Sequence, residues 1–287
     1  MSTGKQELFH PDGRSRGFYS ERNRLNDLTG KEWLYWTRSV ISRPYPIDHQ
    51  HHIRRAHGGQ KPPELCADLV RVFSKAGESV LDPFMGVGGV LIGAELAGRN
   101  ATGIDINPHW ISLYRQVCSL EGLGGLETLA GDAREALPKL RGRRFQLILT
   151  DVPYWQMETA PRSKGEFKRV GQPAAPRRPT RLHGHSDIRY PSKQAWLDAM
   201  GRIFTQATVL LDRNRYLATF IGDMYLQGRY HCLSAELGET LSAIPGLVWK
   251  ANLVWYDVAK ALHLYGYQYA YIPSMLHQNI LVFRKEG

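Results

Sequence analysis

The stretch LDPFMGVGGVLIGAELAG (residues 81–98) decides the fold. A short apolar strand ends at Asp82, three glycines follow between residues 86 and 89, and an apolar helical run begins. Small residues between a strand and a helix let a ligand approach the backbone, and the helix N-terminus favours a negative group. Asp105 lies nineteen residues after Gly86, at the end of the next expected strand, where an acid can grip ribose hydroxyls. The stretch therefore predicts a strand–loop–helix unit that binds a nucleoside.

The segments on both sides repeat this alternation of strand and helix. Apolar patterns predict strands at 79–84, 100–106, 126–133 and 145–151, with helices at 62–77, 88–99 and 108–122. Further helices are expected near 193–211 and 229–243, and further strands at 215–223, 248–258 and 279–285. Strands that alternate with helices at this spacing form a parallel sheet, so the fold class is α/β.

Acids at the strand ends restrict the class of ligand. A nicotinamide or flavin site would carry a third glycine where Leu91 stands, so the dinucleotide fingerprint fails. Asp82 would repel a pyrophosphate but can hold a cation, and Asp132 is placed to accept from an adenine amino group. A nucleoside with a positive group and no phosphate fits these acids. S-adenosylmethionine is such a molecule.

Composition and charge narrow the kind of protein. The chain has 37 Lys and Arg against 27 Asp and Glu, and this excess favours a polyanion partner, although any soluble basic protein shows the same. No apolar run approaches the ~20 residues of a membrane helix, and the N-terminus lacks the apolar core of a signal peptide. Three widely spaced cysteines argue against a disulfide framework or a zinc site. We therefore expect a cytoplasmic protein with reduced thiols and no membrane partner.

Two further stretches complete a known set of motifs. TDVPYW (150–155) ends the fourth strand, and GGQKPPEL (58–65) precedes the first. LDPFMGVGG resembles the D-P-F-x-G-x-G cofactor motif of DNA amino-methyltransferases, TDVPYW resembles their D-P-P-Y catalytic motif, and GGQKPPEL resembles their lysine–proline segment. The resemblance covers about residues 57–155. It implies an S-adenosylmethionine-dependent enzyme of the adenine-N6 and cytosine-N4 family, with a Rossmann-like class I methyltransferase fold and a mostly parallel seven-stranded sheet.

The sequence departs from the family pattern at two points. Val152 replaces the first proline of D-P-P-Y. The catalytic motif also follows the cofactor motif, whereas enzymes with a D-P-F loop often have the reverse order. No large separate recognition domain remains, so we expect the loops and the N-terminal arm to select the target.

The resemblance implies a role for each motif residue. Asp151 and the backbone carbonyl next to Pro153 would accept the two N–H bonds of an exocyclic amine. Tyr154 would stack on a base flipped out of the duplex, and no covalent intermediate is required. Lys61 would face the cofactor carboxylate, or alternatively cap its turn. The full set of cofactor residues implied is Lys61, Asp82, Phe84, Gly86, Gly88, Asp105, Ile106, Asp132 and Ala133.

The chain divides into an arm and a catalytic domain. Residues 1–56 are predicted to form an N-terminal arm, with a tail or an extended segment over 1–30 and a helix within 28–41 for which Thr29 is a candidate cap. Residues 57–287 are predicted to form the catalytic domain. The segment 156–190 interrupts the domain with eight Lys and Arg against three acids, which favours a DNA clamp over an inert insertion. The residues expected to bind nucleic acid are Trp155, Arg162, Lys164, Lys168, Arg169, Arg177, Arg178 and Arg181.

Four histidines crowd the segment before the lysine–proline motif: His49, His51, His52 and His57. Because no cysteine or glutamate pattern accompanies them, a solvated or phosphate-facing loop is favoured over a metal site, and no metal is expected.

The predicted function is methyl transfer to adenine N6 in DNA, because Asp at position 151 resembles adenine-N6 enzymes whereas cytosine-N4 enzymes more often carry Ser. Cytosine-N4 methylation of DNA and guanine-N2 methylation of RNA remain alternatives, as does a catalytically silent nucleic-acid-binding module. Intact Asp151, Pro153 and Tyr154 argue against silence. A protein-glutamine methyltransferase is disfavoured because its usual Asn is Asp here. DNA is the expected partner ahead of RNA, and a homodimer and a cognate restriction enzyme are left open.

Overall fold

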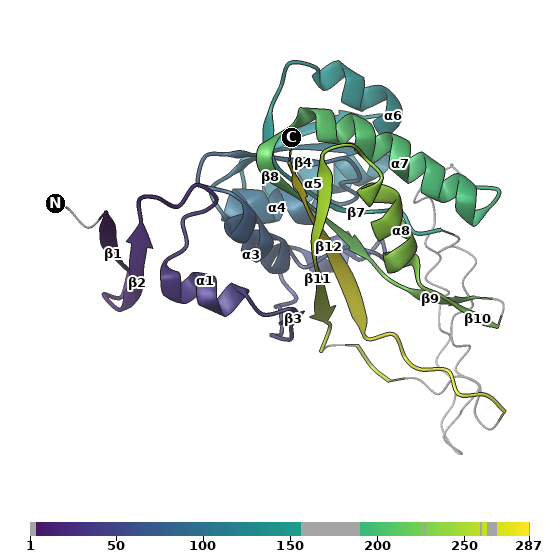
Figure 1. Cartoon of the computed structure of the whole chain (residues 1–287), viewed down its shortest axis with the longest axis horizontal. Coiled ribbons are helices and arrows are strands. Elements are labelled where there is room, and N and C mark those ends of the chain that lie inside the picture. The colour runs from purple at the N-terminus through teal and green to yellow at the C-terminus, as the bar shows by residue number, and fades with distance from the viewer. Residues whose placement is uncertain (1–3, 156–189, 227, 259, 263–268, 287) are drawn as a thin grey trace.

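An eight-stranded sheet runs through the centre of the computed structural model, in the order β3-β11-β12-β8-β7-β4-β5-β6 (Figure 1). The structure describes residues 4–155, 190–226, 228–258, 260–262 and 269–286. The parallel part comprises β6 (Glu127–Ala130), β5 (Asn100–Asp105), β4 (Ser79–Asp82), β7 (Phe145–Asp151) and β8 (Leu211–Ile221). The α/β fold with a mostly parallel sheet is therefore confirmed.

The other edge of the sheet is mainly antiparallel. β12 (His277–Lys285) lies antiparallel between β8 and β11 (Leu247–Tyr256). The two-residue β3 (Val40–Ile41) pairs in parallel with β11. The sheet has eight strands rather than the predicted seven because this short piece of the N-terminal arm adds to its edge.

Helices cover both faces of the sheet. One face carries α3 (Pro63–Phe73), α4 (Gly89–Leu96) and α5 (Pro108–Glu121). The opposite face carries α6 (Ala133–Ala136), η1 (Leu137–Leu140), α7 (Lys193–Leu210) and α8 (Leu233–Ser242). Among the described residues, no helix combines the length and apolar composition that crossing a lipid bilayer requires.

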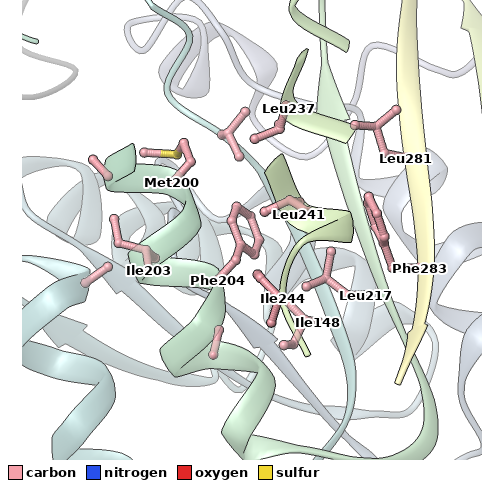
Figure 2. Packing of buried hydrophobic residues seen from close by; sticks show 14 of the residues in the cluster. Ile148, Met200, Ile203, Phe204, Leu217, Leu237, Leu241, Ile244, Leu281 and Phe283 are labelled. Atoms are coloured by element: carbon pink, nitrogen blue, oxygen red, sulfur yellow. The ribbon is translucent and has the colours of Figure 1, made fainter. Parts of the chain in front are cut away.

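The sheet separates two clusters of buried apolar side chains, because successive residues of a strand point to opposite faces. Ile148 of β7 packs on the α7–α8 side, whereas its neighbours Leu147 and Leu149 pack on the α3–α5 side. Figure 2 shows the α7–α8 side, where Phe204 lies among side chains of α8 and of the sheet. Burial on both faces explains why β7 reads as a continuous apolar run before Asp151.

The N-terminal arm is more ordered than its sequence suggests. β1 (Lys5–Phe9) and β2 (Ser15–Ser20) form an antiparallel hairpin, a pairing that the interpretation of residues 1–30 as a tail or an extended arm did not include. The helix α1 (Gly30–Trp36) follows, and Thr29 caps it together with Glu32, as expected from the sequence. The short α2 (His51–Arg54) precedes the lysine–proline motif. A second hairpin, β9 (Met224–Leu226) with β10 (Arg229–His231), occupies the start of the helix predicted at 229–243.

The glycine loop is shaped by packing as well as by ligand access. Gly88 caps α4 with a φ of 75°, in the left-handed region that favours glycine. A Cβ at this position would lie 2.1 Å from Cδ2 of Tyr114, a fully buried ring on α5. Only a glycine therefore allows α5 to pack against the turn that begins α4.

Gly88→Ala should destabilise the fold more than Gly98→Ala. Both glycines have positive φ, but a Cβ at Gly98 would meet nothing within 4 Å. We expect Gly98→Ala to cost about 1–2 kcal/mol from backbone strain, and Gly88→Ala about 1–3 kcal/mol more from the clash with Tyr114. Urea unfolding midpoints would measure both, and equal losses in the two variants would show that Tyr114 does not constrain the loop.

Candidate functional site

The carboxyl ends of neighbouring parallel strands bring three separate motifs together. β4 lies between β5 and β7, so Asp82, Asp105 and Asp151 all end strands at the same edge of the sheet. One cavity at this edge is lined by five of the predicted residues: Lys61, Asp82, Phe84, Gly86 and Asp151. These residues come from the lysine–proline segment, the glycine loop and the D-V-P-Y motif, so the three motifs meet at one cavity.

Asp82 is buried at the end of β4. Its Oδ1 accepts a hydrogen bond of 2.6 Å from the Thr150 hydroxyl and one of 3.1 Å from the Phe84 N–H. Burial raises the pKa of Asp82 to about 7 despite these bonds. A cation that enters the cavity would favour the ionised form.

Asp105 fixes the glycine loop to the next strand. Its two oxygens accept from the backbone N–H groups of Gly86 and Asn107, both at 2.8 Å. Burial raises the pKa of Asp105 to about 6. The carboxylate thus holds the loop conformation, and its predicted contact with ribose, like that of the adjacent Ile106, stays a prediction.

Asp132 is engaged by a neighbouring side chain. It caps α6 through the N–H of Arg134, and its Oδ2 lies 2.5 Å from Nη2 of the Arg134 guanidinium. This pairing lowers the pKa of Asp132. Arg134 therefore competes for the carboxylate that the sequence assigned to an adenine amine; Ala133, at the first position of α6, is buried.

Lys61 pairs with Asp151. Lys61 is buried, and its Nζ donates to Oδ2 of Asp151, while Nη2 of the buried Arg54 donates to the Lys61 carbonyl at 2.5 Å. Burial raises the pKa of Asp151, and the Lys61 ammonium acts against that rise. The predicted contact of Lys61 with a cofactor carboxylate stays a prediction, because in this structure Lys61 faces the catalytic motif.

One oxygen of Asp151 is left as an acceptor. Its Oδ1 is buried and has no hydrogen-bond partner among the described residues. A buried acceptor without a donor is costly in a folded protein and marks a place where a ligand N–H would be stabilised.

The rest of the motif is fixed by distant residues. The indole N–H of Trp196 on α7 donates to the Pro153 carbonyl at 2.8 Å. The carbonyl that precedes Pro153, that of Val152, takes no part in this bond. Val152 is itself buried in the α7–α8 cluster. Nε2 of Gln278 on β12 donates to the Tyr154 hydroxyl at 2.9 Å, and Gly222 leaves room for the ring.

Several of these partners were missed from the sequence. Trp196, Gln278 and Thr150 carry no local signal, because each acts on a residue of another segment. Lys260, after β11, is a further cation whose charge lowers the pKa of Asp151.

The predicted nucleic-acid residues are described only at Trp155. Its ring lies 5.3 Å from that of His231 on β10 in an edge-to-face arrangement. The other seven, from Arg162 to Arg181, lie outside the described residues.

The histidine segment differs from the predicted solvated loop at two positions. His49 is turned inward: its Nε2 lies 3.6 Å from Asp48 and 3.8 Å from Glu64, and its Nδ1 lies 3.4 Å from Glu121. His57 packs edge-to-face on Trp110, with ring centroids 5.0 Å apart. The glutamates that the sequence pattern lacked come from α3 and α5.

The cavity suits a positively charged ligand without phosphate. Asp82 and Asp151 line it together with the glycine loop, and like charges would repel a phosphate there. These are the properties that the sequence predicted for an S-adenosylmethionine site.

Comparisons with known proteins find methyltransferases. The DNA methylase family matches residues 12–116. A tRNA (guanine(10)-N2)-dimethyltransferase of Pyrococcus abyssi is 30% identical over 205 residues, which cover 68% of this chain and 56% of the relative. The type II methyltransferase M.MthZI of Methanothermobacter thermautotrophicus is 34% identical over 101 residues, 33% of this chain and 24% of that protein.

The structural comparison concerns the fold alone. The crystal structure of TrmN from Thermus thermophilus superposes with a TM-score of 0.53 at 18% identity, covering 84% of this chain and 53% of that one. The chain thus spans about half the length, or less, of the relatives it matches.

Asp82→Asn should change how stability depends on pH. The folded pKa of about 7 lies above the ordinary aspartate value, so ionising Asp82 destabilises the fold increasingly from about pH 4 to about pH 7. Asparagine keeps the Oδ1 acceptor for Thr150 and Phe84 and carries no charge. We expect the Tm of the variant, measured by circular dichroism, to rise relative to that of the wild type between about pH 5 and pH 7.

Asp132→Asn is the matched control. Because Arg134 lowers the pKa of Asp132, this group is ionised throughout that range, and its variant should differ from the wild type by a constant amount. Parallel curves for Asp82→Asn and the wild type would contradict the raised pKa.

Proposed function

Because the chain belongs to the family of S-adenosylmethionine-dependent amino-methyltransferases, we propose that it methylates the exocyclic amine of a nucleic-acid base, with adenine N6 in DNA as the first candidate. The observation that carries the proposal is the end of β7. There, Oδ1 of Asp151 is a buried acceptor with no hydrogen-bond partner in the described part of the chain, and Asp151 lines the same cavity as the glycine loop.

Asp151 and the backbone of the motif would hold the amine. The amine of a base is a poor nucleophile because its lone pair is delocalised into the ring. Oδ1 of Asp151 and the Val152 carbonyl can each accept one N–H, which favours a pyramidal nitrogen with its lone pair directed away from the ring. Tyr154, held by Gln278, provides a ring against which a flipped base can stack.

Lys61 would keep Asp151 ready to accept. Asp151 accepts hydrogen bonds through both oxygens when it is ionised, and burial opposes ionisation by raising its pKa. The Lys61 ammonium acts against that rise and so favours the ionised carboxylate.

The cofactor would lie along the glycine loop, where Asp82, Phe84 and Gly86 line the cavity with Asp105 supporting the loop. When bound, S-adenosylmethionine supplies an electrophilic methyl group on a positive sulfur. The buried carboxylates favour that positive charge.

Guanine N2 in RNA is the second candidate base. It is supported by the match to tRNA (guanine(10)-N2)-dimethyltransferases, which spans 205 residues and is longer than the matches to type II methyltransferases. Adenine N6 is supported by the DNA methylase family match and by Asp at position 151. Both amines would use the same acceptors.

The product identifies the base. Wild-type protein and Asp151→Asn are incubated with labelled cofactor and with DNA and RNA pools, and the nucleosides are analysed by mass spectrometry. We expect N6-methyladenine in DNA from the wild type and a loss of about 100-fold or more in the variant, because the charged acceptor is gone. Calorimetry should show that the variant still binds the cofactor.

Other products would change the proposal. N2-methylguanine in RNA would replace the first candidate by the second, and N4-methylcytosine alone would show that Asp151 does not select adenine. Full activity of a folded Asp151→Asn would remove Asp151 from catalysis.

Lys61→Met should move the acid limb of the pH–rate profile. Without the ammonium, the pKa of Asp151 rises, so a higher pH is needed to reach the same ionised fraction. We expect kcat to fall most at low pH and to recover partly as the pH rises, with little change in the KM for cofactor. Lys260→Met, which removes a cation that is not bonded to Asp151, should shift the limb less.

The same variant tests the alternative role of Lys61. If Lys61 instead binds the cofactor carboxylate, Lys61→Met raises the KM for cofactor at every pH and leaves the limb in place.

A further inference from the structure

A basic groove lies between the N-terminal arm and the start of β8. The hairpin β1–β2, the following loop and α1 form one wall, and residues 213–216 with Arg284 form the other. Its volume is about 1020 Å³. The groove is separate from the cavity at Asp82 and Asp151, and no residue lines both.

The charge of the groove is of one sign. Seven Lys and Arg side chains line it, and none of its lining residues is an acid. Two of the seven form ion pairs with acids that do not line the groove: Arg215 with Glu78, and Arg284 with Glu286. The other five form no ion pair with any acid in the described part of the chain and are exposed to solvent: Lys5, Arg22, Arg24, Lys31 and Arg213.

A merely solubilising surface explains this pattern poorly. Some exposed cations outside the groove do pair with acids, as Arg14 does with Asp12 and Arg143 with Glu127. Five unpaired cations around one concave surface repel one another, and a polyanion removes that repulsion.

Aromatic rings lie among the cations. Phe18 on β2 is 58% exposed and Trp33 on α1 is 42% exposed, and both line the groove. Base stacking on such rings stabilises bound single strands.

We infer that this groove binds the phosphodiester backbone of the nucleic acid, with unpaired bases against Phe18 and Trp33; the inference rests on the proposed nucleic-acid substrate. Cations that follow a backbone and rings that stack on bases are the two features of such channels. The groove therefore anchors the substrate, while the cavity at Asp151 receives the base.

The distance between the groove and the cavity sets the minimum length of a nucleic acid that occupies both. β7 and β8 are parallel: Phe145 pairs with Leu211 at the groove end, and Asp151 pairs with Phe220 at the catalytic end. Six residues of strand separate these ends, about 20 Å. A strand or folded RNA that fills both sites must span at least that distance.

Arg22→Gln/Arg24→Gln tests the charge. Binding of 30-nucleotide single-stranded DNA and RNA of one sequence is followed by fluorescence anisotropy against salt, without cofactor. Two lost phosphate contacts should reduce the log–log salt slope by about 1.4 for single strands. Lys139→Gln/Arg141→Gln removes the same charge from exposed side chains outside the groove and should leave the slope unchanged.

Trp33→Leu tests the stacking. It should weaken binding of the single strands roughly tenfold, whereas Leu34→Ala, an exposed residue of the same helix outside the groove, should not. A slope that falls with RNA alone or with DNA alone assigns the anchored strand to that nucleic acid. An unchanged slope with both, or equal losses in the control variants, overturns the inference.

Methylation assays separate this inference from the proposed function. The groove variants should raise the KM for a long nucleic acid and leave kcat unchanged. If the wild type methylates neither pool but the groove variants still lose binding, the groove stands and the proposed function falls. If the wild type methylates a nucleic acid but the groove variants keep the wild-type salt slope, the proposed function stands and the groove inference falls.

Discussion

Carboxylates crowded at the buried ends of neighbouring parallel strands are the constraint on which the site depends. Asp82, Asp105 and Asp151 end β4, β5 and β7 at one edge of the sheet, and burial disfavours the charge of each. Each is stabilised differently: Asp82 by Thr150, Asp105 by two backbone N–H groups, and Asp151 by Lys61. The site is thus built to lower the free energy of an incoming positive charge.

Much of the fold could be predicted because its signals are local. The central strands are buried on both faces, so they read as apolar runs, and Thr29 with Glu32 forms a cap within four residues. The motif residues lining the cavity could also be named, because parallel strands place their carboxyl ends together. The hairpin β1–β2 was missed, since its strands are short and largely exposed and have little apolar alternation to detect.

Long-range pairs could not be predicted, because they depend on the order of the strands. Lys61 meets Asp151 across 90 residues, Trp196 meets Pro153 across 43, and Gln278 meets Tyr154 across 124. For the same reason the environment of His49 could not be predicted, because two of its carboxylate neighbours, Glu64 and Glu121, come from α3 and α5. Nor could the basic groove, which joins residues near the N-terminus to Arg213 and Arg284.

The apolar cluster beneath the D-V-P-Y motif has an evolutionary consequence. Tyr154, Trp155 and Tyr190 all pack against this cluster. Protein interiors are close-packed, so a change of even one methylene in the cluster is transmitted to the rings that rest on it. Descendants of this chain can therefore vary exposed residues more freely than the residues of this cluster, and the position of Tyr154 is inherited together with the core.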